Sequence, residues 1–406
     1  MPEPTYVIVG ASLAGAKAAE TLRAEGFGGQ VVLIGAEAER PYERPPLSKG
    51  YLLGKDEKSS IYVHEEGWYA EHEVDLRLST RATAVDPAAR RVTFADGGSL
   101  DYDRLLLTTG ASPRKLKVPG NDLDGVLYLR TVGHCERLAA ALKAGGQVVI
   151  AGAGWIGLEV AAAAREAGCE VTVIEPEPAA LHRALGPELG AMFTDLHREH
   201  GVQFRFGESV SEFRGSGRVG EVITSSGAAV PADAVVVGIG AVPNTGLAAD
   251  AELEVGNGVV VDAALRTSDS SIYAAGDVAN SYHPLLRRRV RVEHWANALN
   301  AGPAAARSML GQEVSYDPVP YFYSDQYDLG MEAAGLPEPG SYDQVLYRGD
   351  RPGREFIAFW LRDGAVVAGM NVNVWDVNDG IQALIRSGKQ VDPGQLTDPD
   401  VPLGEL

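Results

Sequence analysis

A glycine-rich turn between an apolar strand and a helix lies near the middle of the chain. Residues 148–150 are typical of a strand, and residues 155–167 have the small and apolar composition of a helix that Gly168 ends. In a Gly-x-Gly-x-x-Gly turn the first glycine permits the turn, the second admits a pyrophosphate and the third lets the helix pack on the strand. The helix N-terminus then favours the anion. The predicted nucleotide contacts are Gly152, Gly154, Trp155, Ile156 and Gly157.

An acidic residue follows the next predicted strand, residues 171–174. Glu175 stands about 20 residues beyond the turn, where a carboxylate hydrogen-bonds the adenosine ribose and repels a 2′-phosphate. This position favours NADH over NADPH. The alternatives are a solvated strand end for Glu175 and a purely structural turn for the glycines.

A second unit of the same kind opens the chain. Residues 6–9 and 31–34 are predicted strands, and residues 13–25 are a predicted helix that Gly26 ends. In its turn, residues 10–15, serine replaces the middle glycine, but its hydroxyl can still bond a phosphate oxygen. No acid directly follows the second strand, and Glu37 is the nearest carboxylate. The predicted contacts are Gly10, Ser12, Leu13, Ala14, Gly15, Ala36 and Glu37.

Composition narrows the possible classes of protein. The 406 residues carry 36 Lys and Arg against 55 Asp and Glu, a net charge of −19, and 45% of them are apolar. That length suits two to three domains, and the charge argues against a nucleic-acid partner. No signal peptide and no run of about 18 apolar residues is present, so we expect a cytoplasmic protein with no membrane partner.

Cysteine and histidine usage gives no metal or disulfide signature. Cys135 and Cys169 are too few for a disulfide framework and too far apart for a CxxC pair. His197 and His200 lie on a charged helix without an HExxH arrangement, and we interpret them as a solvated face rather than a metal site. We therefore expect no metal.

Two dinucleotide units without a metal or thiol signature suggest a flavin in one and a nicotinamide in the other. Short strand-like segments surround both units, at 91–94, 104–108, 234–237, 258–262 and 272–275. From about residue 322 the pattern changes to strand-like runs at 344–348, 355–361 and 366–372 and a helix near 377–386. This region is predicted to be a separate α+β domain.

Several dispersed motifs carry a family resemblance. Residues 272–277, Ile-Tyr-Ala-Ala-Gly-Asp, resemble the second FAD signature of flavoprotein reductases with two dinucleotide units. Residues 40–49, 128–131, 238–244, 293–298 and 322–327 are similar, in order, to motifs of ferredoxin reductases that serve oxygenase systems. The chain thus resembles the FAD-dependent pyridine nucleotide-disulfide oxidoreductase superfamily, and within it the NADH:ferredoxin reductases, over essentially its whole length.

The resemblance implies an α/β fold. It comprises two Rossmann-like dinucleotide-binding domains of the glutathione reductase kind and a C-terminal α+β domain. The FAD domain is expected at 1–109 and 242–321, the NADH domain at 110–241 and the C-terminal domain at 322–406.

The resemblance also implies roles for residues outside the glycine turns. Lys49 and Glu159 are the implied catalytic residues, with Glu159 near the nicotinamide and able to pair with Lys49. An unpaired buried carboxylate is costly, although an acid stabilised by the helix dipole is the alternative. Further implied cofactor contacts are Arg44, Lys49, Ala82, Arg130, Gly240, Gly276, Asp277, Glu293 and Trp295. The alternatives are a surface charge for Arg44, ion pairs for Arg130 and Asp277, and a core position for Trp295.

The implied function is electron transfer from NADH through FAD to an iron–sulfur ferredoxin that feeds a Rieske dioxygenase or a haem-thiolate monooxygenase. NADH delivers two electrons as a hydride, whereas the cluster accepts one at a time, and a flavin bridges the two. A rubredoxin reductase and a redox-sensing flavoprotein like apoptosis-inducing factor stay open as alternatives. Disulfide reduction is disfavoured, because no cysteine pair follows the first turn.

The implied ferredoxin partner is usually acidic, and this chain is acidic too. A local basic patch would therefore have to steer docking. The predicted partner-binding patch is Arg287, Arg288, Arg289 and Arg291, and the alternative is a solvated loop with intramolecular ion pairs.

Overall fold

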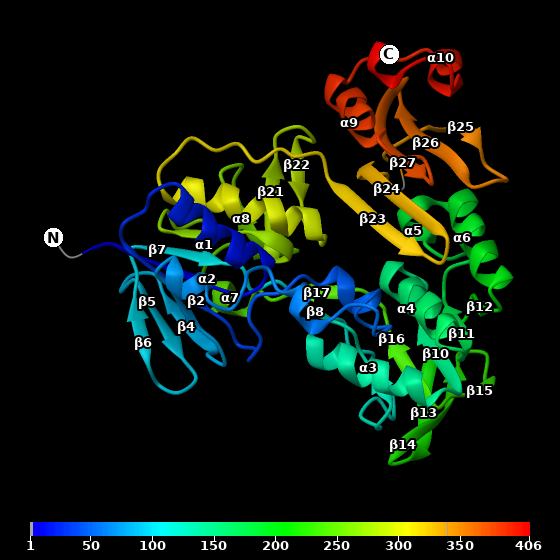
Figure 1. The fold of residues 1–406 in the computed structure, drawn as a ribbon, viewed down its shortest axis with the longest axis horizontal. Coiled ribbons are helices and arrows are strands. Elements are labelled where there is room, and N and C mark those ends of the chain that lie inside the picture. Colours follow the sequence, from blue (N-terminus) through cyan, green and yellow to red (C-terminus); the bar gives the residue numbers. More distant parts are fainter. Residues whose placement is uncertain (1–2, 339) are drawn as a thin grey trace. The chain divides into compact units, whose positions relative to one another are not determined.

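The computed structural model describes residues 3–338 and 340–406, which divide into two compact units. The first unit contains the chain up to Arg44 together with Lys58–Ser112 and Val242–Pro320. The second contains Pro45–Glu57, Pro113–Ala241 and Tyr321–Leu406. Figure 1 shows the elements of both units. The short segment that carries Lys49 therefore belongs to the second unit, although its flanking residues belong to the first.

A parallel five-stranded sheet, in the order β20-β7-β1-β2-β3, is the core of the first unit. β1 (Thr5–Val9) pairs with β2 (Gln30–Ile34), and α1 (Leu13–Ala24) connects them, which confirms the predicted βαβ unit. The strands are almost continuously apolar because both faces of a parallel sheet are covered. The other members of this sheet are β3 (Val74–Arg77), β7 (Arg104–Leu107) and β20 (Ile272–Ala274).

Helix α8 (Trp295–Met309) packs along α1, as Figure 1 shows for the two helices. The two backbones come very close at Gly302, where a Cβ atom would lie 2.2 Å from the carbonyl oxygen of Ala14. Only glycine fits such an approach. The N-terminal turn of α1 is thus fixed by both its own strand and α8.

Two smaller sheets complete the first unit, in the orders β4-β5-β6 and β18-β19-β21-β22. Their strands, and the remaining helices of the unit, are β4 (Ala82–Asp86), β5 (Arg91–Phe94), β6 (Ser99–Asp101), β18 (Val255–Gly256), β19 (Gly258–Val261), β21 (Ala279–His283), β22 (Arg288–Val290), η2 (Lys58–Ile61), α2 (Trp68–Glu71), α7 (Gly246–Asp250) and η3 (Gly276–Val278).

The second unit repeats the arrangement with a parallel sheet in the order β12-β11-β10-β16-β9. β10 (Gln147–Ala151), α4 (Trp155–Glu166) and β11 (Glu170–Glu175) form the second predicted βαβ unit. The other elements are η1 (Pro45–Ser48), β9 (Val126–Leu127), α3 (Val132–Ala144), α5 (His182–Leu185), α6 (Pro187–Glu199), β12 (Gln203–Phe206), β16 (Ala234–Val237), and the sheet of β13 (Val210–Ser216), β14 (Arg218–Thr224) and β15 (Ala229–Pro231). The chain passes between the units within β8 (Ala111–Pro113) and β17 (Ala241–Pro243).

The C-terminal part of the second unit is an antiparallel sheet in the order β23-β24-β27-β26-β25. α9 (Asn378–Ser387) packs on β24 and β27, with Ile381 so close that a Cβ on Gly369 would lie 2.4 Å from its Cγ2 atom. The predicted runs near 344, 355 and 366 are strands, whereas the first hairpin of the sheet was anticipated only as a sequence motif. The remaining elements are β23 (Tyr321–Gln326), β24 (Leu329–Gly335), β25 (Gln344–Asp350), β26 (Glu355–Arg362), β27 (Ala365–Val372), α10 (Pro393–Thr397) and η4 (Leu403–Glu405).

The architecture confirms the α/β fold class, with two parallel sheets and a C-terminal α+β part. Within the described ranges, none of the helices combines the length and apolar composition needed to cross a membrane.

Candidate active site

The first glycine turn connects β1 to α1 and leaves the helix N-terminus open. Gly10 has a φ of +125°, and a Cβ there would lie 2.1 Å from the carbonyl oxygen of Thr108. A Cβ on Gly15 would lie 2.1 Å from the carbonyl oxygen of Gly10. Ser12 is the N-cap residue, yet its side chain accepts no capping hydrogen bond. The N–H groups of the first turn are therefore uncapped by a side chain, as an anion site requires.

The second glycine turn connects β10 to α4 and has the same geometry. A Cβ on Gly152 would lie 2.5 Å from the carbonyl oxygen of Gly238, and one on Gly157 would lie 2.1 Å from that of Gly152. A Cβ on Gly154, in contrast, would meet no neighbouring atom of the described residues within 4 Å. The outer glycines are thus required by the fold, whereas the middle one only keeps space open. Such a space beside uncapped N–H groups fits a pyrophosphate.

The two large side chains of this turn, Trp155 and Ile156, differ in exposure. Trp155 is half-buried and its ring lies 5.6 Å from that of Phe193 in an edge-on contact. Ile156 is 44% exposed beside the open N-terminus of α4.

The carboxylate of Glu175 accepts two backbone hydrogen bonds, one of them from the second turn. Its Oε2 atom accepts a hydrogen bond from the backbone N–H of Ala153 over 2.7 Å, and its Oε1 atom accepts one from that of Glu177 over 2.9 Å. The acidic residue therefore lies against the turn, as the motif predicts. Its contact with a ribose stays a prediction.

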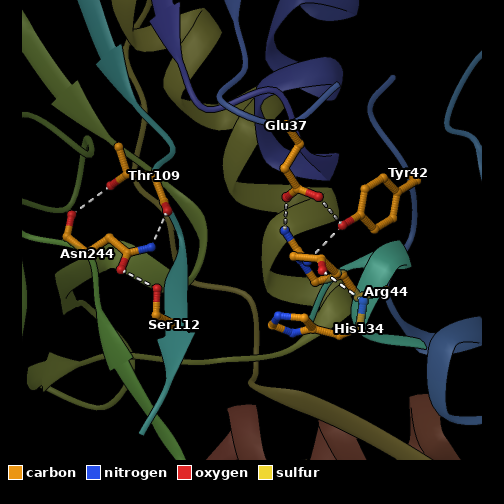
Figure 2. A network of polar contacts seen from close by, with 8 residues as sticks. Glu37, Tyr42, Arg44, Thr109, Ser112, His134 and Asn244 are labelled. Carbon is orange, nitrogen blue, oxygen red and sulfur yellow. Dashed lines mark hydrogen bonds and ion pairs between the residues drawn. The ribbon is translucent and has the colours of Figure 1, made fainter. Parts of the chain in front are cut away.

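A cluster of polar side chains surrounds Glu37, just after β2 (Figure 2). The hydroxyl of Tyr42 donates to Oε2 of Glu37 over 2.7 Å, and Nη2 of Arg44 lies 3.6 Å from Oε1. Arg44 also donates to the Tyr42 hydroxyl over 3.2 Å. The structure thus joins two predicted contacts, Glu37 and Arg44, through a buried tyrosine that sequence reasoning missed. Ala36, which immediately precedes Glu37, is exposed.

A second cluster of hydrogen bonds in Figure 2 joins Thr109 and Ser112 to Asn244, just after the chain re-enters the first unit at Val242. Asn244 accepts from Ser112 over 2.8 Å and donates to the backbone oxygen of Thr109 over 2.8 Å. Thr109 in turn donates its hydroxyl hydrogen to the backbone oxygen of Asn244 over 2.9 Å. The final residue of the 238–244 motif therefore has a structural role here. Gly240, at φ +94°, is exposed and accepts from the N–H of Arg114 over 2.9 Å.

Gly276 and Asp277 lie beside the first glycine turn. A Cβ on Gly276, at φ +76°, would lie 3.2 Å from the Cβ of Ala14. The carbonyl oxygen of Asp277 accepts from Nη1 of Arg291 over 3.2 Å. The structure therefore brings together two motifs that are about 260 residues apart in sequence, as the FAD signature implies.

The remaining implied cofactor contacts lie in different parts of the fold. They are Glu293, Trp295, Ala82 and Arg130. Glu293 pairs with Arg291, whereas Nε1 of Trp295 donates to Oε2 of Glu43 over 3.1 Å. Ala82 begins β4, and Arg130 follows β9 as a half-buried side chain. Their cofactor contacts stay predictions.

Lys49 and Glu159 form a buried ion pair in the second unit. Nζ of Lys49 lies 2.6 Å from Oε1 of Glu159, and the Glu159 side chain is 5% exposed. This confirms the implied pairing over the alternative of a helix-dipole acid alone. Ser324 donates to the same oxygen over 2.7 Å, and Ser48 donates to Oε2. A buried carboxylate with three donors is well satisfied.

The arginines of the predicted patch are not equivalent. Arg287 and Arg289 are exposed, and Arg288 is half-buried. The Arg291 side chain is only 10% exposed, because it pairs with Glu293 and donates to Oδ1 of Asn257 over 3.0 Å. Arg291 thus serves the fold of its own unit.

The predicted solvated position of His197 is wrong. Its side chain is fully buried, and Nε2 lies 2.8 Å from Oε1 of Gln326 while Nδ1 lies 3.2 Å from the Tyr327 hydroxyl. Burial lowers the pKa of His197 to about 4, so the ring is neutral near pH 7. Among the described residues, no three His, Cys, Asp or Glu side chains are grouped as metal ligands.

Comparisons with known proteins agree with this geometry. The pattern of the family described as pyridine nucleotide-disulphide oxidoreductase matches residues 4–302, and that of the reductase C-terminal domain matches residues 321–406. The chain is 42% identical to the ferredoxin–NAD(+) reductase component of the anthranilate 1,2-dioxygenase system of Burkholderia cepacia, with 99% of each covered. It is 38% identical to putidaredoxin reductase of Pseudomonas putida, with 98% of this chain and 96% of the relative covered.

A solved structure has the same fold over the whole length. The covalent complex of putidaredoxin reductase and putidaredoxin matches with a TM-score of 0.95 at 37% identity, covering 100% of this chain and 98% of the other.

Proposed function

Since the chain belongs to the pyridine nucleotide-disulphide oxidoreductase family, we propose that it is an FAD-dependent NADH:ferredoxin oxidoreductase of an oxygenase system. The observation that carries the proposal is the pair of open glycine turns, one in each unit, each at the end of a parallel strand. The relatives named for ferredoxin reduction support the choice of acceptor. We place the activity in the cytoplasm, in agreement with the low cysteine content.

Residues 1–109 and 242–321 would bind FAD, residues 110–241 would bind NADH, and residues 322–406 would form the C-terminal domain. Gly276 beside Ala14 supports FAD at the first turn. FAD would be held by the first turn, the Glu37 cluster and Asp277. The second turn, with Glu175 braced against it, would hold NADH and favour it over NADPH.

When bound, the flavin supplies the conversion between one hydride and two single electrons. The protein needs no nucleophile for this chemistry. Lys49 would place one positive charge at the cofactors, and Glu159 would orient that charge and stabilise positive charge that develops on a nicotinamide. Both residues belong to one unit, so their mutual geometry is set by one body.

The acceptor would be an iron–sulfur ferredoxin that binds the β21–β22 hairpin. Exposed Arg287 and Arg289 supply positive charge there, with the half-buried Arg288 between them. Tyr282, 42% exposed, pairs with Arg289 across the hairpin. An exposed aromatic ring beside arginines is typical of a protein interface.

The proposal is tested by anaerobic stopped-flow mixing of flavin-loaded protein with NADH or NADPH, followed by candidate ferredoxins. We expect rapid bleaching of the flavin by NADH, slower bleaching by NADPH, and reoxidation by a ferredoxin. Reduced flavin that neither a ferredoxin nor a rubredoxin reoxidises would contradict the proposal and favour a redox sensor. Reoxidation by a rubredoxin alone would change the acceptor class.

A further inference from the structure

A chain of buried polar side chains connects helix α6 to the carboxylate that pairs with Lys49. Nε2 of His197 lies 2.8 Å from Oε1 of Gln326, and Nε2 of Gln326 lies 3.0 Å from Oγ of Ser324. Oγ of Ser324 lies 2.7 Å from Oε1 of Glu159. His197, Gln326 and Ser324 are at most 1% exposed. All of these residues belong to the second unit.

The chemistry of the side chains fixes the direction of every hydrogen bond. An amide oxygen only accepts, so Nε2 of His197 carries the hydrogen and donates to Gln326. Gln326 then donates its amide N–H to Ser324, whose own hydrogen is left for Glu159. Nδ1 of the neutral ring is the acceptor and faces the Tyr327 hydroxyl. Each hydrogen in the chain therefore points toward Glu159.

The Glu159 carboxylate fixes this direction. Ser324 has one hydroxyl hydrogen and donates it to Glu159, so the Ser324 oxygen is left to accept the amide N–H of Gln326. If the Gln326 amide turned over, its oxygen would face the Ser324 oxygen, and two acceptors would meet in a dry interior unless the hydroxyl turned away from Glu159. With the Gln326 oxygen facing His197, the ring donates from Nε2 and in turn holds the amide in this orientation.

We propose that His197, Gln326 and Ser324 are positioning residues of the active site, which hold the Glu159 carboxylate against Lys49 through one directed chain of hydrogen bonds. The inference rests on the proposed function for the role of Lys49 and Glu159 toward the cofactors. Its three residues act through Glu159 and not on the cofactors. The C-terminal strand β23 thereby supplies two of the three positioning residues.

At a hydride-transfer site, this chain of hydrogen bonds would keep the Glu159 carboxylate in a fixed position. A carboxylate that receives directed donors is held in one orientation. A fixed negative charge stabilises positive charge on a nicotinamide more than a mobile one does. Loss of any link frees the Ser324 hydroxyl to turn away from Glu159, even though the Lys49 pair remains.

The kinetic test is a double-mutant cycle on flavin-loaded protein. We expect Ser324→Ala and His197→Phe each to lower the limiting rate of flavin reduction by NADH by about tenfold, the fold-change of one hydrogen bond to a charged group. The NADH concentration at half-saturation should change by less than about twofold. Because Ser324→Ala already cuts the chain, the double variant should be no slower than Ser324→Ala.

Two further variants separate positioning from loss of structure. His197→Gln keeps an N–H donor and should restore the rate to within about threefold of wild type. Thr194→Val is the matched control. Thr194 is also buried on α6, but its hydroxyl donates to the backbone oxygen of Gly190 and takes no part in the hydrogen bonds that lead to Glu159. It should leave the rate unchanged. Gln326→Leu cuts the same link from β23 and takes the place of His197→Phe should that variant not fold.

A spectroscopic readout needs no turnover. Nitrogen-15 NMR of the imidazole, in flavin-loaded protein without NADH, should show the neutral Nε2–H tautomer for His197. Glu159→Gln places an amide donor before Ser324 and should shift the His197 resonances, although the two residues do not touch. Thr194→Val should leave these resonances in place.

Additive costs in the cycle, or His197 resonances that ignore Glu159→Gln, would overturn the inference. A wild-type protein that takes no hydride from NADH would instead refute the proposed function. In that case the NMR measurement still decides whether the directed chain exists.

Discussion

The indole Nε1 of Trp295 donates to Oε2 of Glu43 over 3.1 Å, so the first residue of α8 is held by the loop after β2. We expect Glu43→Ala to lower the free energy of unfolding by about 1 kcal/mol, the typical value of one hydrogen bond. Glu43→Gln keeps an acceptor and should lose less. Urea unfolding of the three proteins checks this, and equal losses in both variants would contradict it.

The two glycines of the second turn should respond oppositely to alanine. At Gly152 a Cβ would meet backbone at 2.5 Å and φ is +103°, so Gly152→Ala should destabilise the protein by at least about 2 kcal/mol. Gly154 has a φ of −80° and open space around a Cβ. Gly154→Ala should therefore unfold within about 0.5 kcal/mol of wild type, yet weaken NADH binding roughly tenfold. Equilibrium titration with NADH, beside thermal melts, measures both effects.

The buried pair of Lys49 and Glu159 predicts an asymmetry between single and double variants. Lys49→Met leaves a buried carboxylate without its cation and should cost about 3 kcal/mol of stability. Adding Glu159→Gln removes that charge and should recover most of the loss, although flavin reduction by NADH stays slow. Denaturant midpoints that fall further in the double variant would disprove the argument.

His197 gives the folded protein a specific sensitivity to acid. Burial lowers its pKa to about 4 from the ordinary value of 6.5, so the unfolded chain binds the extra proton between these values. Stability should therefore decline as pH falls from 6.5 to 4 and show no further loss from this residue below 4. The upper bound is roughly 3 kcal/mol. In His197→Gln this contribution is absent, and the difference between the two unfolding curves across this window measures it.

Charge reversal in the β21–β22 hairpin should affect docking and leave the half-reaction with NADH unchanged. Arg287→Glu and Arg289→Glu together should slow reoxidation by ferredoxin on the order of tenfold at low ionic strength, and salt should reduce the difference. Arg291→Glu, in contrast, breaks the pair with Glu293 and should reduce stability. Ferredoxin titrations at two salt concentrations, with flavin bleaching by NADH as the control, test this.

Local patterns in the sequence were enough to predict both βαβ units. The strand, turn and helix of each are contiguous, so apolar runs and glycines define them directly, as the bounds of α1 and α4 show. The pairing of Lys49 with Glu159 came from family resemblance, because the two positions are far apart in the chain. Ser324, the third partner, is 165 residues from Glu159, and no local signal connects them.

The position of His197 was misjudged from its charged neighbours. Asp195, Arg198 and Glu199 are indeed exposed. The helical period, however, places His197 on the same face as Leu189 and Phe193, and that face is buried. Spacing was thus a better guide than composition on this helix.

The compact unit that carries Glu159 is assembled from three separate stretches of sequence, and each contributes to the same carboxylate. A protein that received only the contiguous central stretch, residues 113–241, would therefore receive Glu159 without these partners. Lys49 would be lost from one side and Ser324 from the other. An exchange that keeps the Glu159 carboxylate with its present partners has to carry all three stretches.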